Sequence, residues 1–394
     1  MQSICQQIAA YVDSQRENIL RDIRTVVDME GHYEEKENVE KVQQWFRSAL
    51  EAEGFSCHVE PVAPDRAGLL IGMLGEDRPG QPVLFSGHLD TVFHTGEFRS
   101  GEPFRQEGDR LTGPGVHDMK SGAVMALYTI RALNEIGWNE RPIKVIFVGE
   151  EESDHIGNHA DDQIVENSRG CLCAFNMESG IESNALCVGR KCQLTFTLTV
   201  HGKGGHAGND YQTGRSAILE TMRKLEKIDA LADWDRGTTV TPTIIHGGTH
   251  NSSIPEHCET VIDVRVFSDA EEQRIRQEMA RIAATLLIDG TSAELSCEKS
   301  RYYGYSETPQ IAVFHAFMNE IAQELGCAPF GKIVAGGAAD SGNIAHAADV
   351  PVLCAFGIRG GCDHSKDEYA ILSSAYERIR ILAYAVTQLD RLHL

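Results

Sequence analysis

The stretch SGAVMALYTIRALNEIGWNERPIKVIFVGE, residues 121–150, contains the two patterns that decide the fold. Residues 121–137 are expected to form a helix that ends at Gly137, and residues 142–150 form an apolar run. Helices that alternate with such runs are typical of a layered α/β sheet, whose strands are buried on both faces. The stretch therefore predicts a buried strand that leads into a run of three glutamates, Glu150-Glu151-Glu152.

The same alternation extends to both sides of this stretch. Before it, apolar residues repeat at helical spacing, Gly54 is a natural helix stop, and short apolar runs follow. The predicted elements are helices at 36–55, at 311–326 and from Ser373 onward, and strands at 57–62, 69–74, 82–88 and 350–357.

A different pattern begins near residue 190. Residues 192–202 (CQLTFTLTVHG) alternate apolar and polar side chains, which is typical of a strand with one face in solvent. The elements that follow have the order βαββαβ, the split βαβ layout of a small open-faced sandwich. A chain of 394 residues also exceeds one ordinary core. We therefore predict a larger α/β domain made of residues 1–189 and 304–394, interrupted by an α+β domain at 190–303.

The composition limits the partners and the compartment. A net charge of −22 disfavours nucleic acid and anionic membrane surfaces, because both would repel the protein. No run approaches 18 apolar residues, and the first 20 residues lack the features of a secretory signal. The eleven cysteines are scattered without a CxxC motif, so we interpret them as small apolar residues in a reducing cytoplasm. A thiolate pair at Cys171 and Cys173 is the alternative.

Two histidines and several carboxylates follow predicted strands or turns. These residues are His88, Asp90, Asp118, Glu150–Glu152, Glu178 and His364. A mixed nitrogen and oxygen ligand set suits zinc, cobalt or manganese, whereas thiolate-rich sites suit softer metals. Two histidines and three carboxylates exceed the needs of one tetrahedral zinc ion, and two ions that share a carboxylate would use them all. The set therefore favours a two-metal hydrolase.

Taken one at a time, these residues are weaker evidence for a metal site than the whole set is. Asp90 follows His88 by two residues, so its carboxylate can accept the proton on the nitrogen of His88 that does not bind metal. Asp118 lies between a Gly-rich turn and a helix, where the alternative role is that of an N-cap. The three glutamates could also be a solvated charge run. Their position after a buried strand, where open α/β sheets bind ligands, favours the metal site.

Other catalytic motifs are missing or misplaced. Residues 202–207 (GKGGHA) satisfy GxGxxA, but the strand before them alternates and a turn delays the next helix. A dinucleotide site is therefore disfavoured. The sequence also lacks a phosphate-binding GKS or GKT loop and a GxSxG nucleophile motif.

The chain resembles the co-catalytic zinc hydrolases that include bacterial glutamate carboxypeptidase, aminoacylase, acetylornithine deacetylase, succinyl-diaminopimelate desuccinylase and several dipeptidases. The shared segments are GHLDTV (87–92), GPGVHDMKSG (113–122), VIFVGEEES (145–153), NMESG (176–180), GKGGHAG (202–208), DVR (263–265), GGAADSGN (336–343) and DHSKDE (363–368). They occur in the family's order and span nearly the whole chain. The resemblance implies a layered zinc-exopeptidase-like catalytic domain, a ferredoxin-like dimerisation domain inserted into it, and a homodimer.

The resemblance also implies a role for each predicted ligand. Asp118 would bridge two Zn²⁺ ions, for which Co²⁺ or Mn²⁺ could substitute. His88 and Glu178 would complete one site, and His364 would bind the second ion together with one of the glutamates.

The three glutamates leave two alignments open. The family pattern is usually Asp-Glu-Glu, which makes Glu150 the counterpart of the Asp, Glu151 the general base and Glu152 the ligand. The alternative is a shift by one residue, with Glu150 as the base and Glu151 as the ligand. It stays open because Glu150 departs from the family's aspartate.

Further roles are implied for the inserted domain and for one glycine pair. His206 would stabilise the oxyanion in the partner subunit's site. Arg265 would bind a substrate carboxylate through two parallel hydrogen bonds, with a surface salt bridge as the alternative and Asn251 as a lesser candidate beside it. Gly336 and Gly337 would let the backbone approach the ligand closely.

We therefore expect a cytoplasmic, homodimeric, zinc-dependent metallopeptidase without nucleic-acid or membrane partners. It would cleave an amide bond beside a free carboxylate, in a small peptide or an N-acyl amino acid, with Glu151 accepting the proton of a bridging water. The first alternative is a deacylase of the acetylornithine deacetylase or desuccinylase kind. The second is a non-catalytic metal-binding scaffold of the same fold.

Overall fold

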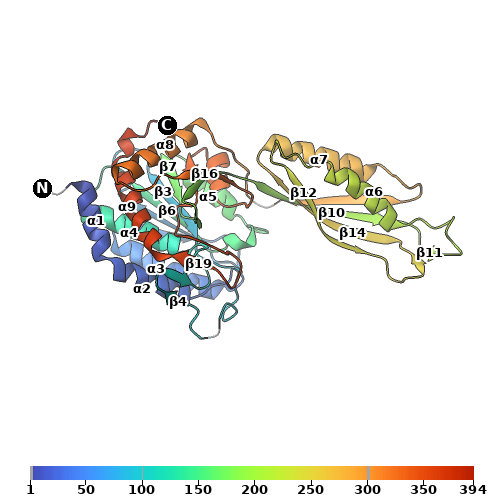
Figure 1. Ribbon diagram of the computed structural model, residues 1–394, viewed down its shortest axis with the longest axis horizontal. Coiled ribbons are helices and arrows are strands. Elements are labelled where there is room, and N and C mark those ends of the chain that lie inside the picture. The colour runs from blue at the N-terminus through green and yellow to red at the C-terminus, as the bar shows by residue number, and fades with distance from the viewer. Residues whose placement is uncertain (1–2, 100, 300–301) are drawn as a thin grey trace. The chain divides into compact units, whose positions relative to one another are not determined.

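A computed structural model describes residues 3–99, 101–299 and 302–394 of the chain (Figure 1). Contacts between residues divide it into two units. Unit 1 comprises Met1–Gly189, Glu307–Val334 and Ala339–Leu394, and unit 2 comprises Arg190–Ser306 and Ala335–Ala338.

The centre of unit 1 is a six-stranded mixed sheet. Its strands, in spatial order, are β1 (Ser56–Glu60), β2 (Leu69–Leu74), β6 (Ile143–Val148), β3 (Val83–His88), β7 (Cys173–Asn176) and β17 (Val352–Leu353). Strands β6, β3, β7 and β17 run parallel, and β2 is antiparallel to both β6 and β1. Every residue of β3 is buried, as expected for a strand covered on both faces. The predicted layered α/β fold is confirmed.

The helices of unit 1 pack on this sheet or on one another. They are α1 (Ile4–Ser14), α2 (Arg16–Asp28), α3 (Lys36–Ala52), α4 (Lys120–Glu135), α5 (Ala160–Ser168), α8 (Pro309–Glu324) and α9 (Leu372–Thr387), with short turns η1 (Glu151–Ser153), η2 (Asn343–Ala347) and η3 (Leu389–Arg391). Helix α4 contacts β3 as well as α1, α2 and α9, and it is almost completely buried. A Cβ atom on Gly122 would lie 2.0 Å from the carbonyl oxygen of Met177. The glycine therefore lets the start of α4 lie directly against the chain that follows β7.

A second, smaller sheet completes unit 1. It orders β4 (Arg105–Glu107), β5 (Arg110–Thr112), β19 (Tyr369–Ile371), β18 (Arg359–Gly361) and β8 (Gly180–Ile181). The pair β9 (Ala185–Arg190) and β16 (Gly331–Ala335) also lies largely in this unit. The strand predicted at 350–357 is shorter than expected, because only residues 352–353 pair as β17 and Ala355 has a positive φ of 69°.

Unit 2 is a four-stranded antiparallel sheet with two helices. The spatial order is β12 (Thr239–Gly247), β14 (His257–Val266), β10 (Cys192–His201) and β15 (Ser292–Lys299), and the helices are α6 (Ala217–Asp229) and α7 (Asp269–Ala284). Buried and half-buried residues alternate strictly along β10, as its sequence predicts. The apolar face packs with both helices into one core. The predicted α+β fold of βαββαβ order is thus confirmed for this part of the chain. A short antiparallel pair of β11 (Gly205–His206) and β13 (Ser253–Ile254) also belongs to this unit.

Among the described residues, no helix is both long enough and apolar enough to span a membrane.

Candidate metal centre

The five predicted metal ligands lie together in unit 1. Their positions are the end of β3 for His88, the turn before α4 for Asp118, η1 for Glu152, the residues after β7 for Glu178, and the link between β18 and β19 for His364. They form two groups of potential ligands, His88–Asp118–Glu178 and Asp118–Glu152–His364. Asp118 belongs to both groups, so one carboxylate is placed to serve two ions.

The distances within each group match those of ligands around one ion. His88 Nε2 lies 3.1 Å from Asp118 Oδ1 and 3.5 Å from Glu178 Oε1. His364 Nε2 lies 3.3 Å from Asp118 Oδ2 and 3.2 Å from Glu152 Oε2. Metal bonds of about 2.0 Å at a tetrahedral ion separate its ligand atoms by roughly 3.3 Å. The two oxygens of Asp118 thus face different histidines, as expected of a bridging carboxylate.

The strand order of the sheet explains why these residues meet. Strands β6, β3 and β7 are parallel neighbours, so their carboxyl ends lie at the same edge. His88 ends β3, the three glutamates follow β6, and Glu178 follows β7. This edge is where open α/β sheets bind their ligands. Residues far apart in the sequence are therefore brought together by the sheet itself.

Asp90 connects two of the candidate ligands. Its Oδ1 lies 3.3 Å from Nδ1 of His88, and its Oδ2 accepts a hydrogen bond of 2.9 Å from the backbone N–H of Glu152. Both Asp90 and His88 are buried. A carboxylate beside the second ring nitrogen of a metal-binding histidine fixes the ring's orientation and tautomer. The arrangement is the one expected from the spacing of His88 and Asp90.

The other two glutamates of the run have different surroundings. The buried Glu151 places Oε2 4.0 Å from His88 Nε2, beside the ligand groups. Glu150 is fully buried, and its carboxylate accepts hydrogen bonds from Ser153 Oγ, His155 Nδ1 and Asn158 Nδ2. It belongs to neither ligand group.

The electrostatics of the cluster favour a bound cation. Burial raises the pKa of Glu151 well above its usual range and raises that of Glu152 to about 7. Hydrogen bonds to Asp118 and Glu152 raise the pKa of His364 to about 11. Although burial opposes it, hydrogen bonds from His364 and His88 hold the pKa of Asp118 well below its usual range. Crowded buried carboxylates of this kind need protons or metal ions to offset their charges.

Sequence reasoning missed the residue that holds the Asp118 turn. The buried carboxylate of Glu368 accepts hydrogen bonds from the backbone N–H groups of Gly115, His117 and Asp118, at 3.3, 2.8 and 3.1 Å. Glu368 is the last residue of DHSKDE (363–368), one of the segments that carry the family resemblance, but the resemblance alone assigns this residue no role. Only the tertiary structure shows that it faces the turn.

The remaining predicted site residues belong to unit 2. His206 is exposed on β11, and its Nδ1 accepts hydrogen bonds of 3.2 Å from the N–H groups of Gly208 and Asn209. With its neighbours it lines an open cavity of about 740 Å³. The exposed Asn251 accepts a hydrogen bond of 3.3 Å from Ser252 Oγ.

Arg265 and the glycine pair complete this set. Arg265, on β14, donates through Nε to Asp263 Oδ1 at 3.1 Å, which is the salt bridge considered as an alternative. Gly337 accepts a hydrogen bond of 3.4 Å from Arg190 Nη1. A Cβ on Gly336 would meet nothing within 4 Å among the described atoms. Glycine is therefore not required at 336 by its surroundings in this structure.

The chain is similar in sequence to known peptidases. Residues 84–388 match the sequence model of peptidase family M20/M25/M40. The chain is 26% identical over 253 residues to carboxypeptidase G2 of Pseudomonas sp. (strain RS-16), which covers 63% of this chain and 59% of that protein. It is 32% identical over 241 residues to succinyl-diaminopimelate desuccinylase 2 of Ruegeria sp. (strain TM1040), covering 56% of this chain and 59% of that protein.

A solved structure extends the similarity to the complete fold. The crystal structure of aminopeptidase PepT from Bacillus cereus ATCC 10987 superimposes with a TM-score of 0.81 at 18% identity. The match covers 95% of this chain and 99% of that one. At this identity the likeness shows the fold alone.

Proposed function

Because the chain belongs to peptidase family M20/M25/M40, we propose that it is a two-metal hydrolase of amide bonds. Its substrate would be a small peptide or an N-acyl amino acid with a free carboxylate beside the scissile bond. The observation that carries the proposal is the position of Asp118 between two ligand groups at the carboxyl edge of the sheet.

The ligand set supports two Zn²⁺ ions, for which Co²⁺ or Mn²⁺ could substitute. His88 and Glu178 would hold one ion, Glu152 and His364 the other, and Asp118 both. Imidazole nitrogens and carboxylate oxygens without thiolates suit these metals. When bound, such a pair of ions lowers the pKa of water and polarises a carbonyl oxygen.

Glu151 is the proposed general base. It would accept a proton from the attacking water and deliver it to the leaving amine. Its support is its position beside His88, the burial that raises its pKa, and the contrasting surroundings of its neighbours. Glu152 lies in a ligand group, whereas Glu150 is bonded to Ser153, His155 and Asn158. These contacts favour Glu151 over Glu150 as the base, with Asp90 orienting His88.

Substrate recognition is proposed for unit 2, which includes the glycine pair. Arg265 would bind the substrate carboxylate, with Asn251, Gly336 and Gly337 near the ligand. Only Nε of Arg265 donates to another residue in the described part of the chain, so both of its Nη groups remain available. A guanidinium with two such groups matches a carboxylate bidentately. His206 would donate a hydrogen bond to the oxyanion in the partner subunit's site.

A homodimer is proposed because unit 2 presents exposed apolar side chains. Strand β12 is an edge of its sheet, with Ile244 48% and Ile245 52% exposed. On α6, Leu219 and Met222 are 49% and 54% exposed. Edge strands and apolar surfaces of this kind are typical of protein–protein interfaces.

A cytoplasmic location is proposed from the cysteines, which are all free thiols.

The test is a substrate panel assayed with purified protein loaded with zinc, cobalt or manganese. The panel contains dipeptides and N-acetyl, N-succinyl and N-carbamoyl amino acids. Turnover of dipeptides supports the main proposal. Turnover of acyl amino acids alone supports the second candidate, a deacylase, which the 32% identity to a desuccinylase favours. A metal-loaded protein that is inactive on the whole panel would contradict both and favour a scaffold.

A further inference from the structure

We propose that His32, Glu34 and His94 form an additional cation site in unit 1, suited to a borderline ion such as Zn²⁺. One potential ligand atom from each residue lies within 4.8 Å of the other two. Two imidazoles and a carboxylate are a ligand set that zinc uses in proteins. The site shares no residue with the proposed metal centre and does not depend on the proposed reaction.

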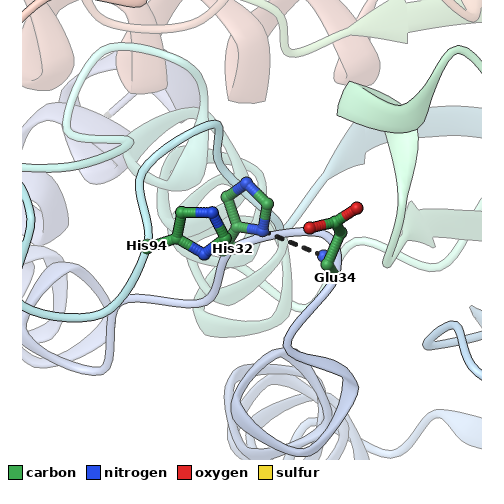
Figure 2. Close-up of side chains that lie close together, drawn as sticks. All are labelled: His32, Glu34 and His94. Carbon is green, nitrogen blue, oxygen red and sulfur yellow. Dashed lines mark hydrogen bonds between the residues drawn. The ribbon is translucent and has the colours of Figure 1, made fainter.

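The three residues come from two separate segments of the chain. His32 and Glu34 lie between α2 and α3, and His94 lies in the loop after β3. The two imidazole rings are stacked, with centroids 3.7 Å apart and planes inclined by 23°. Figure 2 shows the rings beside each other and the carboxylate of Glu34 turned toward His32. A cation here would join the two segments.

Backbone contacts hold these segments together before any ion binds. Tyr33 N–H donates to Thr91 O at 3.2 Å, and Thr91 N–H donates to Gly31 O at 2.9 Å. The Glu30 carboxylate also accepts a hydrogen bond of 2.9 Å from Gly96 N–H in the His94 loop. Because the backbone is already paired, an ion has to order only side chains, which reduces the entropic cost of binding.

The surroundings of both histidines suit metal binding. Nδ1 of His94 lies 3.2 Å from Glu35 Oε1, so a carboxylate engages this nitrogen and Nε2 is the nitrogen left to take an ion. A carboxylate behind a metal-binding histidine is the common arrangement in metal sites. Burial, and then the neighbouring His94, lower the pKa of His32. The lowered pKa favours the neutral form of the His32 ring.

The same geometry predicts weaker binding than at the proposed centre. His32 Nδ1 accepts a hydrogen bond of 3.1 Å from the N–H of Glu34. Binding of an ion breaks this hydrogen bond whichever ring nitrogen takes the ion. An ion on Nδ1 uses the lone pair that accepts the bond, and an ion on Nε2 leaves the proton on Nδ1, which can then no longer accept. The ligand atoms must also approach from within 4.8 Å to roughly 3.3 Å of one another. The His94 ring must also turn out of its stack on His32, because an imidazole nitrogen binds a metal ion in the plane of its ring. Glu34 and His94 are exposed and can make these adjustments.

The experiment counts zinc by equilibrium dialysis and elemental analysis at rising free Zn²⁺. Wild type is compared with H94Q and with the double variant H32Q/H94Q. The control H58Q/H159Q removes two histidines of unit 1 whose side chains are 59% and 73% exposed. At saturation we expect about one zinc ion fewer per chain in both site variants and no change in the control.

Equal zinc content in wild type and H94Q would overturn the proposal. H94Q is the decisive variant, because the His94 side chain is 55% exposed and its replacement leaves the core intact. The test depends on the difference in zinc content between wild type and variants, and not on the total zinc content of any one protein. Failure of the proposed two-ion centre would lower the count in all four proteins alike, so the two failures are distinguishable. A second check is the melting temperature, which excess zinc should raise more in wild type than in H94Q, because H94Q keeps the proposed two-ion centre but lacks the additional site.

Discussion

Nε2 of His155 lies 2.8 Å from Oδ1 of Asp340, and both side chains are buried. On its other side, Nδ1 of the same ring contacts the carboxylate of Glu150. Burial opposes protonation, but Asp340 and Glu150 together raise the pKa of His155 well above its usual range. An imidazolium thus links the start of the glutamate run to the segment before η2.

Replacing this histidine should destabilise the protein strongly. H155L leaves Glu150 and Asp340 buried without their shared cation, and breaking a buried charge pair costs about 3–5 kcal/mol. Urea unfolding followed by circular dichroism would measure this loss. H159Q, which replaces an exposed histidine four residues away, is the control and should stay near wild type. A loss below about 1 kcal/mol in H155L would contradict a structural role for this pair.

E151Q should keep its metal but lose nearly all turnover. Glutamine preserves the shape of Glu151 but cannot accept a proton, and general base catalysis contributes about 10²–10⁴-fold. The measurements are kcat on the best substrate of the panel and metal content by elemental analysis. Wild-type-like turnover would remove Glu151 from the role of base, and E150Q would then be the variant to assay.

E368A should weaken metal binding without removing a ligand. The alanine leaves the N–H groups of Gly115, His117 and Asp118 without their acceptor, so the turn that carries Asp118 loses its support. Loss of such a supporting contact lowers metal affinity by about 10–100-fold. Competition with a chelator would measure the affinity. The adjacent, exposed Asp367 provides the control D367N, and equal affinity in both variants would count against this role.

R265K should impair binding of substrates that carry a free carboxylate. Lysine lacks the planar pair of donors, so we expect KM to rise about tenfold or more with a smaller change in kcat. The same assay on a substrate with an amidated carboxyl group should show no difference between the variant and wild type. An equal rise in KM for both substrates would indicate that Arg265 acts in another way. R276Q, on α7, serves as the matched control.

Acid stability of unit 2 should depend on Glu271. Hydrogen bonds from Arg274, Arg236 and Thr238 lower its pKa to about 2, although burial opposes the shift. The folded-state pKa lies below the unfolded value of about 4.5, so the carboxylate stabilises the fold above pH 4.5, and this stabilisation is lost as the pH falls toward 2. Because both arginines are partly exposed, we expect only about 1 kcal/mol.

The variant E271Q tests this dependence. Chemical unfolding at pH 7 and pH 3 should show a smaller difference between the two pH values in E271Q than in wild type. E278Q, which replaces an exposed partner of Arg281 on the same helix, should behave like wild type. An unchanged pH dependence in E271Q would contradict the assignment.

Much of the fold was predictable because it depends on local patterns. The apolar run at 142–150 and the alternation at 192–202 predicted a buried and a half-exposed strand, and both formed as β6 and β10. Side-chain periodicity follows directly from backbone geometry, so such elements are readable without tertiary information. The run at 350–357 was the exception, since only residues 352–353 form a strand of the six-stranded sheet.

The sequence by itself determined the elements, the chemical kinds of the candidate ligands and their places after strands. The tertiary structure alone decided which side chains meet. It placed β6, β3 and β7 side by side, turned the two oxygens of Asp118 toward different histidines, and brought Glu368 to the turn before α4. It also stacked His32 on His94 across two segments. These contacts join residues distant in the chain, and their geometry depends on strand order and packing, which local periodicity does not encode.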